Sequence, residues 1–240
     1  MEVEGGPVKS LEDIHFFADL DSKVRQKLET ECRWRRVHAG QRIIDFGSET
    51  RDVFFVAEGA VSVVNFSLSG REIAFASVEA GDSFGELSAI DGRPRSASVV
   101  AVQDSLIATM PSRTFLKVLQ ERVEVTFKVL KRLSHMVRSG DVRIMELSTL
   151  AATQRVYAEL LRMAQPDAAV PSLWIVRPLP PLREIASRVS TTRETAARAL
   201  SQITAAGLVR RKGRNLYLMD RAKLEEVVNA LHFAETSQAA

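Results

Sequence analysis

The chain has one cysteine, Cys32, among its 240 residues. One thiol cannot form an internal disulfide or a multi-cysteine metal site, and an iron–sulfur cluster needs several thiolates. The four histidines are scattered, and no pair has the spacing of a metal-binding motif. We therefore expect no metal, and we expect each histidine to be structural or at the surface.

Long apolar runs are also missing. No stretch approaches the roughly 20 apolar residues that a membrane-spanning helix needs, and the acidic start, residues 1–4, is not followed by the apolar core of a signal peptide. These absences favour a cytoplasmic location without a membrane partner. The sequence also lacks a nucleophile–base set and a P-loop, so we expect a protein that is not an enzyme.

Charge is unevenly distributed, although the net charge is only +3. Residues 151–240 hold 13 Lys and Arg against 8 Asp and Glu, whereas residues 1–150 hold 20 against 22. The span 181–214 alone holds eight basic residues and two glutamates. A local basic region is typical of a surface that binds nucleic acid, although a solvated charged surface has the same composition.

The first half of the chain has the pattern of a β-rich domain. Residues 12–33 predict short helices, and residues 38–110 hold short β-branched and aromatic runs. Glycines interrupt these runs about every ten residues, at Gly40, Gly47, Gly59, Gly70 and Gly81. Regular turn signals between short strands predict an all-β sandwich or roll. We expect a hairpin tip at residues 69–71.

Residues 84–99, FGELSAIDGRPRSASV, are the segment with the most informative set of candidate binding groups. A guanidinium such as that of Arg95 matches the oxygens of a phosphate, with Ser96 beside it. Gly85 lets the backbone come close, and backbone N–H groups near Leu87 can form an anion-binding nest. The Glu86 carboxylate can accept from a sugar hydroxyl. The segment therefore predicts a cyclic-nucleotide site. A pair nine residues apart can also be an exposed ion pair, or a pocket that has lost its ligand.

A long helix is expected after residue 111. It carries apolar residues at alternating steps of three and four, which is the seam of a coiled coil. The seam residues are Leu130, Leu133, Val137, Gly140, Ile144 and Leu147. We expect this seam to form a homodimer, the alternative being packing against the β-roll. Gly140 is costly inside a helix, so a close helix crossing or a ligand is expected there.

Residues 181–219 predict a winged helix-turn-helix. Two helices, 181–189 and 193–203, are separated by a three-residue turn, and a two-stranded wing follows at 208–219. The N-terminal part of the second helix would face bases in the major groove, with Arg suited to guanine and Glu to cytosine. The expected base contacts are Arg193, Glu194 and Arg198, and the expected phosphate contacts are Thr191, Thr192, Lys212 and Arg214. A solvated helix start is the alternative.

Two strings resemble signatures of one family over nearly the whole chain. F-G-E-L followed by P-R-S-A-S-V resembles the phosphate-binding cassette of cyclic-nucleotide-binding domains, and R-E-T-A-A-R resembles the recognition helix of the CRP/FNR family, named after the cyclic-AMP receptor protein and the fumarate–nitrate regulator. The resemblance implies an α+β fold: a cyclic-nucleotide-binding β-roll (1–111), a long dimerisation helix with linker (112–150) and a winged helix-turn-helix (151–240).

The same resemblance implies function. The effector would be cyclic AMP, with Glu86 at the ribose 2′-hydroxyl and with Arg95 and Ser96 at the cyclic phosphate. The partners would be a second subunit, a palindromic double-stranded operator with TGTGA-like half-sites, and RNA polymerase. The family's loop that contacts the polymerase is not recognisable in residues 165–171.

The long helix departs from the family pattern. When residues are counted without gaps between Arg95 and Arg155, the two positions that contact the base in the family fall on Gly140 and Asp141. Neither is the residue type that the family has there. The nearest polar candidates are Ser139 and Asp141, and a carboxylate can accept from an amino group of adenine or of guanine. Cyclic GMP, another small effector, or no nucleotide at all therefore stay open. A cyclic-nucleotide module of an enzyme or channel would need an inhibitor sequence or membrane segments, which we do not find.

Overall fold

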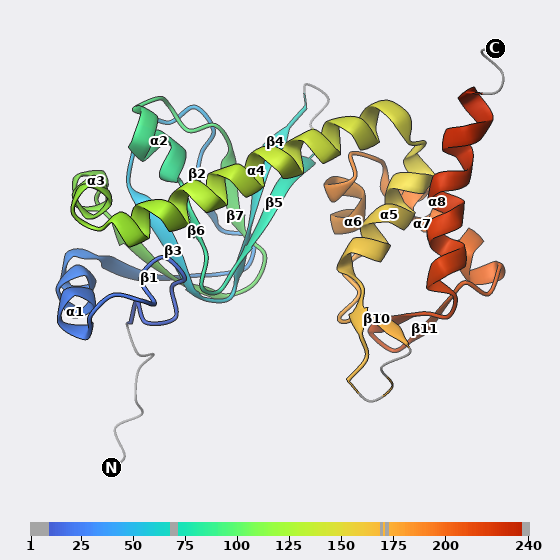
Figure 1. Cartoon of the computed structure of the whole chain (residues 1–240), viewed down its shortest axis with the longest axis horizontal. Coiled ribbons are helices and arrows are strands. Elements are labelled where there is room, and N and C mark those ends of the chain that lie inside the picture. The colour runs from blue at the N-terminus through green and yellow to red at the C-terminus, as the bar shows by residue number, and fades with distance from the viewer. Residues whose placement is uncertain (1–9, 68–71, 169, 171–172, 237–240) are drawn as a thin grey trace. The chain divides into compact units, whose positions relative to one another are not determined.

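The computed structural model describes residues 10–67, 72–168, 170 and 173–236. The chain forms two compact units, one up to Met136 and one from Val137 onwards (Figure 1). The boundary falls inside a long helix, whereas the sequence suggested a separate helical segment between two domains. The hairpin tip expected at residues 69–71 lies outside the described residues.

The first unit contains a β-roll made of two antiparallel four-stranded sheets, with orders β1-β8-β3-β6 and β2-β7-β4-β5. The strands are β1 (Arg33–Val37), β2 (Arg42–Ile44), β3 (Val53–Glu58), β4 (Ala60–Phe66), β5 (Glu72–Glu79), β6 (Ser83–Phe84), β7 (Ser98–Ala101) and β8 (Ser105–Met110). Alternate residues of strands from both sheets, among them Val56, Val61 and Ile107, fill the space between them. The β-roll predicted from the glycine spacing is confirmed.

Helices cover one end of this β-roll (Figure 1). They are α1 (Ser22–Glu31), α2 (Glu86–Asp91), α3 (Ser112–Glu121) and the first turns of α4 (Val123–Thr149). A second core, containing Phe17, Phe55, Phe115 and Val125, lies between these helices and the β1-β8-β3-β6 sheet. The helix expected from residue 112 is broken at Arg122, whose φ of −129° ends α3.

Cys32 belongs to that second core. Burial raises the pKa of its thiol to about 12, and the neighbouring Glu31 and Glu29 carboxylates add to the shift. A thiol with such a high pKa is almost entirely protonated near neutral pH, so Cys32 behaves as a small apolar side chain.

The second unit is a helical domain with a small antiparallel sheet of order β11-β12-β10-β9. Its elements after α4 are α5 (Ala152–Met163), β9 (Gln165–Pro166), β10 (Trp174–Val176), α6 (Leu182–Arg188), α7 (Arg193–Ala205), β11 (Val209–Lys212), β12 (Asn215–Leu218) and α8 (Arg221–Thr236). Leu160, Ile185, Ala196 and Leu216 are among the residues of its core. This core holds α6 and α7 against α5 and the wing.

Candidate functional site

The predicted cassette begins where β6 meets α2. Gly85 joins them with a φ of +83°, a left-handed conformation that side chains disfavour. A Cβ at Gly85 would come within 2.7 Å of Arg95 Nη1 and 3.2 Å of the Asp52 carbonyl oxygen. Glycine is therefore needed here both for the backbone conformation and for the close approach of Arg95.

Arg95 is only 2% exposed and is fixed by the wall of the β-roll. Its Nη1 donates to the Gly85 carbonyl at 2.7 Å, its Nη2 to the Asp52 carbonyl at 2.7 Å and its Nε to Thr50 Oγ1 at 3.0 Å. The guanidinium also lies 5.6 Å from the centre of the Phe54 ring. Burial lowers the pKa of Arg95, and nearby carboxylates oppose that shift. These bonds use three of its five N–H donors.

Glu86 is the first residue of α2 and is 3% exposed. Within the described part of the chain, its Oε2 has no hydrogen-bond partner. Burial raises the pKa of Glu86, and a backbone hydrogen bond and the nearby Arg132 and Arg95 oppose the rise. Leaving a buried carboxylate oxygen without a donor costs free energy. This oxygen therefore suits a hydroxyl supplied by a bound molecule.

Arg132 was missed by the sequence reasoning. It extends from α4 to β6, where its Nη2 donates to the Ser83 carbonyl at 2.6 Å and its Nη1 lies 3.4 Å from Asp82 Oδ1. Its Nε and the Ser83 hydroxyl are buried without partners among the described residues. A usable signal was present, because Arg132 continues the helical face on which Val125 and Val129 are buried.

Other predicted ligand residues lie on two elements. Ser96 and Leu87 are exposed in the cassette, and Ser139, Gly140 and Asp141 lie on α4 in the second unit, with Ser139 and Asp141 exposed. A Cβ at Gly140 would meet no atom within 4 Å among the described residues. No neighbour inside the described chain therefore requires glycine there. The ligand contacts of all five residues stay predictions.

The apolar seam of α4 divides into two parts. Leu133 packs against the core between the helices and the β-roll, as the alternative to a dimer seam predicted. Val137 and Ile144 are each 64% exposed, and Leu130 and Leu147 are also exposed. Large apolar side chains exposed in a row on one helix are typical of a surface that contacts another chain.

The helix-turn-helix is confirmed, with α7 extending two residues further than predicted. α6 ends at Arg188 and α7 begins at Arg193, so the turn comprises residues 189–192, one residue more than predicted. Thr192 caps α7, because its Oγ1 accepts from the Thr195 N–H at 3.2 Å. Ser190 has a φ of +54°, the only such non-glycine residue among those described.

The three predicted base-contacting residues lie on the exposed side of α7. Arg193, Glu194 and Arg198 are all solvent-exposed. The pKa of Glu194 is lowered by a backbone hydrogen bond at the helix start and by the Thr192 side chain. Its carboxylate is therefore ionised at neutral pH and can accept a hydrogen bond from a base amino group.

The predicted phosphate contacts differ in exposure. Lys212 and Arg214 are exposed at the wing tip, and Thr192 is exposed at the start of α7. Thr191 is only 8% exposed, and its backbone N–H donates to the Ala186 carbonyl at 2.9 Å. Its phosphate contact stays a prediction, and its burial argues against it.

Membrane spans and clusters of metal ligands are both missing from the described residues. No helix among them is both long enough and apolar enough to cross a membrane. The same residues include no group of three or more His, Cys, Asp or Glu side chains placed to hold a metal ion.

Comparison with known proteins matches both regions of the chain. Residues 34–122 match the cyclic nucleotide-binding domain family, and residues 154–227 match the Crp-like helix-turn-helix domain family. The chain is 29% identical to the cyclic AMP receptor protein of Thermus thermophilus over 192 residues, which is 80% of this chain and 86% of that protein. It is also 29% identical to the cAMP-activated global transcriptional regulator Vfr of Pseudomonas aeruginosa, over 79% of this chain and 91% of Vfr.

A solved structure agrees with these matches. FixK2 from Bradyrhizobium japonicum superimposes with a TM-score of 0.69 at 25% identity, covering 81% of this chain and 96% of that one. The segment that holds Glu86 and Arg95 and the α6–α7 pair therefore lie within regions that known families share.

Proposed function

The chain belongs to the CRP/FNR family of transcription regulators, and on this premise we propose that it is a homodimer whose binding to operator DNA is controlled by cyclic AMP. Its two matched domains support a cyclic nucleotide as effector and DNA as partner. The two relatives named for cyclic AMP support the choice of that nucleotide. We place the protein in the cytoplasm, where operator DNA and RNA polymerase, its further proposed partner, are found.

One observation carries the effector assignment: the buried Glu86 Oε2 has no hydrogen-bond partner among the described residues and is close to two arginines. A ribose 2′-hydroxyl would give this oxygen the donor that it lacks. The two N–H groups of Arg95 that make no bond to the described residues would be available to the cyclic phosphate, together with the Ser96 hydroxyl. Arg132 would supply a second positive charge near the same carboxylate.

The proposed contacts of the nucleotide base lie on α4. We propose Ser139 and Asp141 of α4, or the same residues of a second subunit, as its hydrogen-bonding partners. Gly140 supports this proposal, because it leaves open space beside the helix. Asp141 can accept from the amino group of either purine, so cyclic GMP would bind the same residues.

The proposed mechanism of control uses α4. The exposed residues Leu130, Val137, Ile144 and Leu147 would pair with those of a second copy and place two recognition helices on one operator. Two half-sites about one DNA turn apart, ~34 Å, require one spacing of these helices. A nucleotide that binds more tightly to the dimer with this spacing would increase DNA affinity by shifting the population.

Calorimetric titration with cyclic AMP and cyclic GMP tests the effector. The Arg95→Leu variant should lose about 100-fold or more in affinity, because two charge-assisted hydrogen bonds contribute about 1.5–3 kcal/mol each. Arg93→Leu is the matched control, since Arg93 is exposed two residues earlier in the same loop. Equal affinity of the two variants for the nucleotide would contradict the assignment.

The main alternative is a regulator of the same family that uses another small effector or none. This alternative is supported by Gly140 and Asp141, which do not match the two base-contacting residues of the family. Wild-type protein that binds operator tightly, yet shows no heat with either nucleotide, would decide for this alternative.

A further inference from the structure

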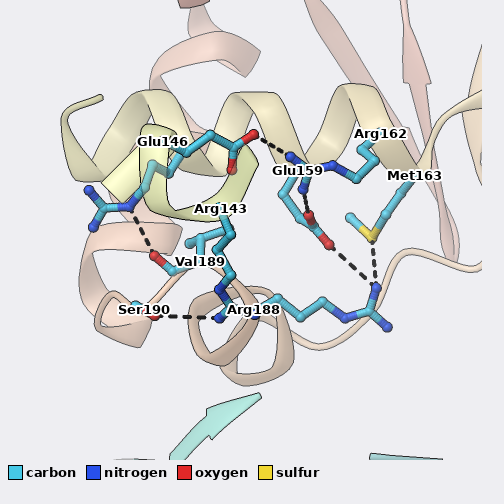
Figure 2. Close-up of polar contacts among 9 residues, drawn as sticks. Arg143, Glu146, Glu159, Arg162, Met163, Arg188, Val189 and Ser190 are labelled. Atoms are coloured by element: carbon cyan, nitrogen blue, oxygen red, sulfur yellow. Dashed lines mark hydrogen bonds and ion pairs between the residues drawn. The ribbon is translucent and has the colours of Figure 1, made fainter. Parts of the chain in front are cut away.

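The turn that precedes the recognition helix is held by two arginines from other helices. Ser190 has a left-handed backbone without being glycine, which costs free energy unless its surroundings hold it. Arg143 of α4 donates through Nη2 to Ser190 Oγ at 3.5 Å, and Arg155 of α5 donates through Nε to the Val189 carbonyl at 3.0 Å. Consecutive residues of the turn are thus tied to α4 and to α5 (Figure 2).

A buried carboxylate links the same helices. Glu159 of α5 is 6% exposed and accepts hydrogen bonds from Arg162 and from Nη1 of Arg188, the latter at 3.4 Å. Arg162 also donates to Glu146 of α4, and Arg188 is the last residue of α6. Figure 2 shows Glu159 between these arginines. An ionised carboxylate needs such cations when it is buried.

These hydrogen bonds and ion pairs depend on one another, because they share the same arginines and carboxylates. Four arginines lie in this region, Arg143, Arg155, Arg162 and Arg188, and Glu159 and Glu146 are the carboxylates that join α4, α5 and α6. Burial lowers the pKa of Arg143, while Glu159 and Glu146 act in the opposite direction. Without Glu159, Arg162 would keep its bond to Glu146 of α4. Arg188 would keep its bond to Glu184 within its own helix, and a weak contact at 3.7 Å with Met163 Sδ would be its remaining hydrogen bond to α5 among the described residues.

We propose that Glu159 and Arg143 are positioning residues for DNA recognition: they join the C-terminal part of α4 to α5 and to the turn before α7, so that α4 and the recognition helix move as one body. The proposal rests on the proposed function in one respect, since these contacts would be the route by which a change in α4 alters DNA binding. Neither residue needs to touch the DNA or the nucleotide.

The test uses Glu159→Gln, with Glu184→Gln as matched control. Glu184 binds the same Arg188 at 2.7 Å, and this bond lies within α6. Operator affinity is measured by fluorescence anisotropy with and without cyclic AMP, and nucleotide affinity by calorimetry without DNA. In Glu159→Gln the ratio of the two operator affinities should fall about tenfold or more, while nucleotide affinity stays unchanged. Glu184→Gln should keep the wild-type ratio.

A merely structural role would weaken DNA binding equally with and without nucleotide, and an unchanged ratio in Glu159→Gln would overturn the proposal. If that variant does not fold, Arg143→Gln removes the guanidinium that bonds Ser190 from α4 and carries the same expectation.

A second measurement does not depend on the effector. Hydrogen–deuterium exchange of the nucleotide-free protein should show faster exchange at residues 190–196 in Glu159→Gln and not in Glu184→Gln. Wild-type protein that fails to respond to nucleotide would refute only the proposed function. Unchanged exchange at residues 190–196 would refute the positioning role.

Discussion

Replacing Gly85 with alanine tests how the β-roll holds Arg95 in place. The new Cβ would lie 2.7 Å from Arg95 Nη1, well inside contact distance. An arginine end can usually move away, but this one is fixed by three hydrogen bonds. The variant must therefore break at least the bond from Nη1 to the Gly85 carbonyl.

The loss in the free energy of unfolding of Gly85→Ala has two parts. A left-handed backbone at a residue with a Cβ costs about 1–2 kcal/mol, and losing one hydrogen bond from a charged group costs about 1.5–3 kcal/mol. Gly85→Ala should therefore lower the free energy of unfolding by about 2.5–5 kcal/mol. It should also weaken cyclic-nucleotide binding at least tenfold, because the guanidinium is displaced.

Gly92→Ala is the control for the backbone contribution to the loss of stability. Gly92 has a similar φ of +71°, but a Cβ there would meet nothing closer than 3.8 Å. It should lose only about 1–2 kcal/mol and keep its nucleotide affinity. Urea unfolding and calorimetry measure both quantities. Equal losses of stability in the two variants, with equal nucleotide affinity, would refute the reasoning.

Three further predictions concern other parts of the chain. Because burial raises the pKa of Glu86 above its unfolded value, its contribution to stability is present below the unfolded pKa and is lost as pH rises through the folded pKa. Nucleotide-free Glu86→Gln should therefore melt at a higher temperature than wild type near pH 7, with a difference that shrinks towards acidic pH in a calorimetric scan. Ile144→Glu should give monomers in sedimentation experiments and lose only the stability that association supplies, whereas Leu133→Glu should lower the melting temperature further, since Leu133 packs against the core of the first unit; a dimeric Ile144→Glu variant would count against the seam. Arg198→Ala should cost about 1–3 kcal/mol per half-site and relax preference at one base pair, whereas Lys212→Ala should weaken all sequences alike and reduce the salt dependence by about one phosphate contact; a uniform loss in Arg198→Ala would make Arg198 a phosphate contact instead.

The sequence predicted most of the elements because their signals are local. Regular glycines marked the strands of the β-roll, and the turn before Arg193 placed α6 and α7 to within two residues. The break between α3 and α4 was not predictable, because no glycine or proline marks Arg122. Thr126 helps to define that break, since its hydroxyl donates to the Leu119 carbonyl at the end of α3.

The candidate site was predicted only where it is contiguous. Glu86 and Arg95 share one segment, so their chemistry was visible in the sequence. Arg132 and Glu159 lie on helices where charged residues are common, and tertiary packing alone decides that the Arg132 Nε and the Glu159 side chain are buried. Their positions beside apolar residues of the same helical face were the available signal.

The protonated, buried thiol of Cys32 makes this chain convenient for spectroscopy. With a pKa of about 12, only roughly 1 in 10⁴ to 10⁵ of its thiols is ionised near neutral pH, and maleimide or iodoacetamide reagents attack the thiolate. An ordinary cysteine placed at an exposed position with no proposed ligand contact, such as that of Arg93, would then be labelled selectively without removing the native one. A fluorophore at that position would report nucleotide arrival directly, in an otherwise unaltered protein.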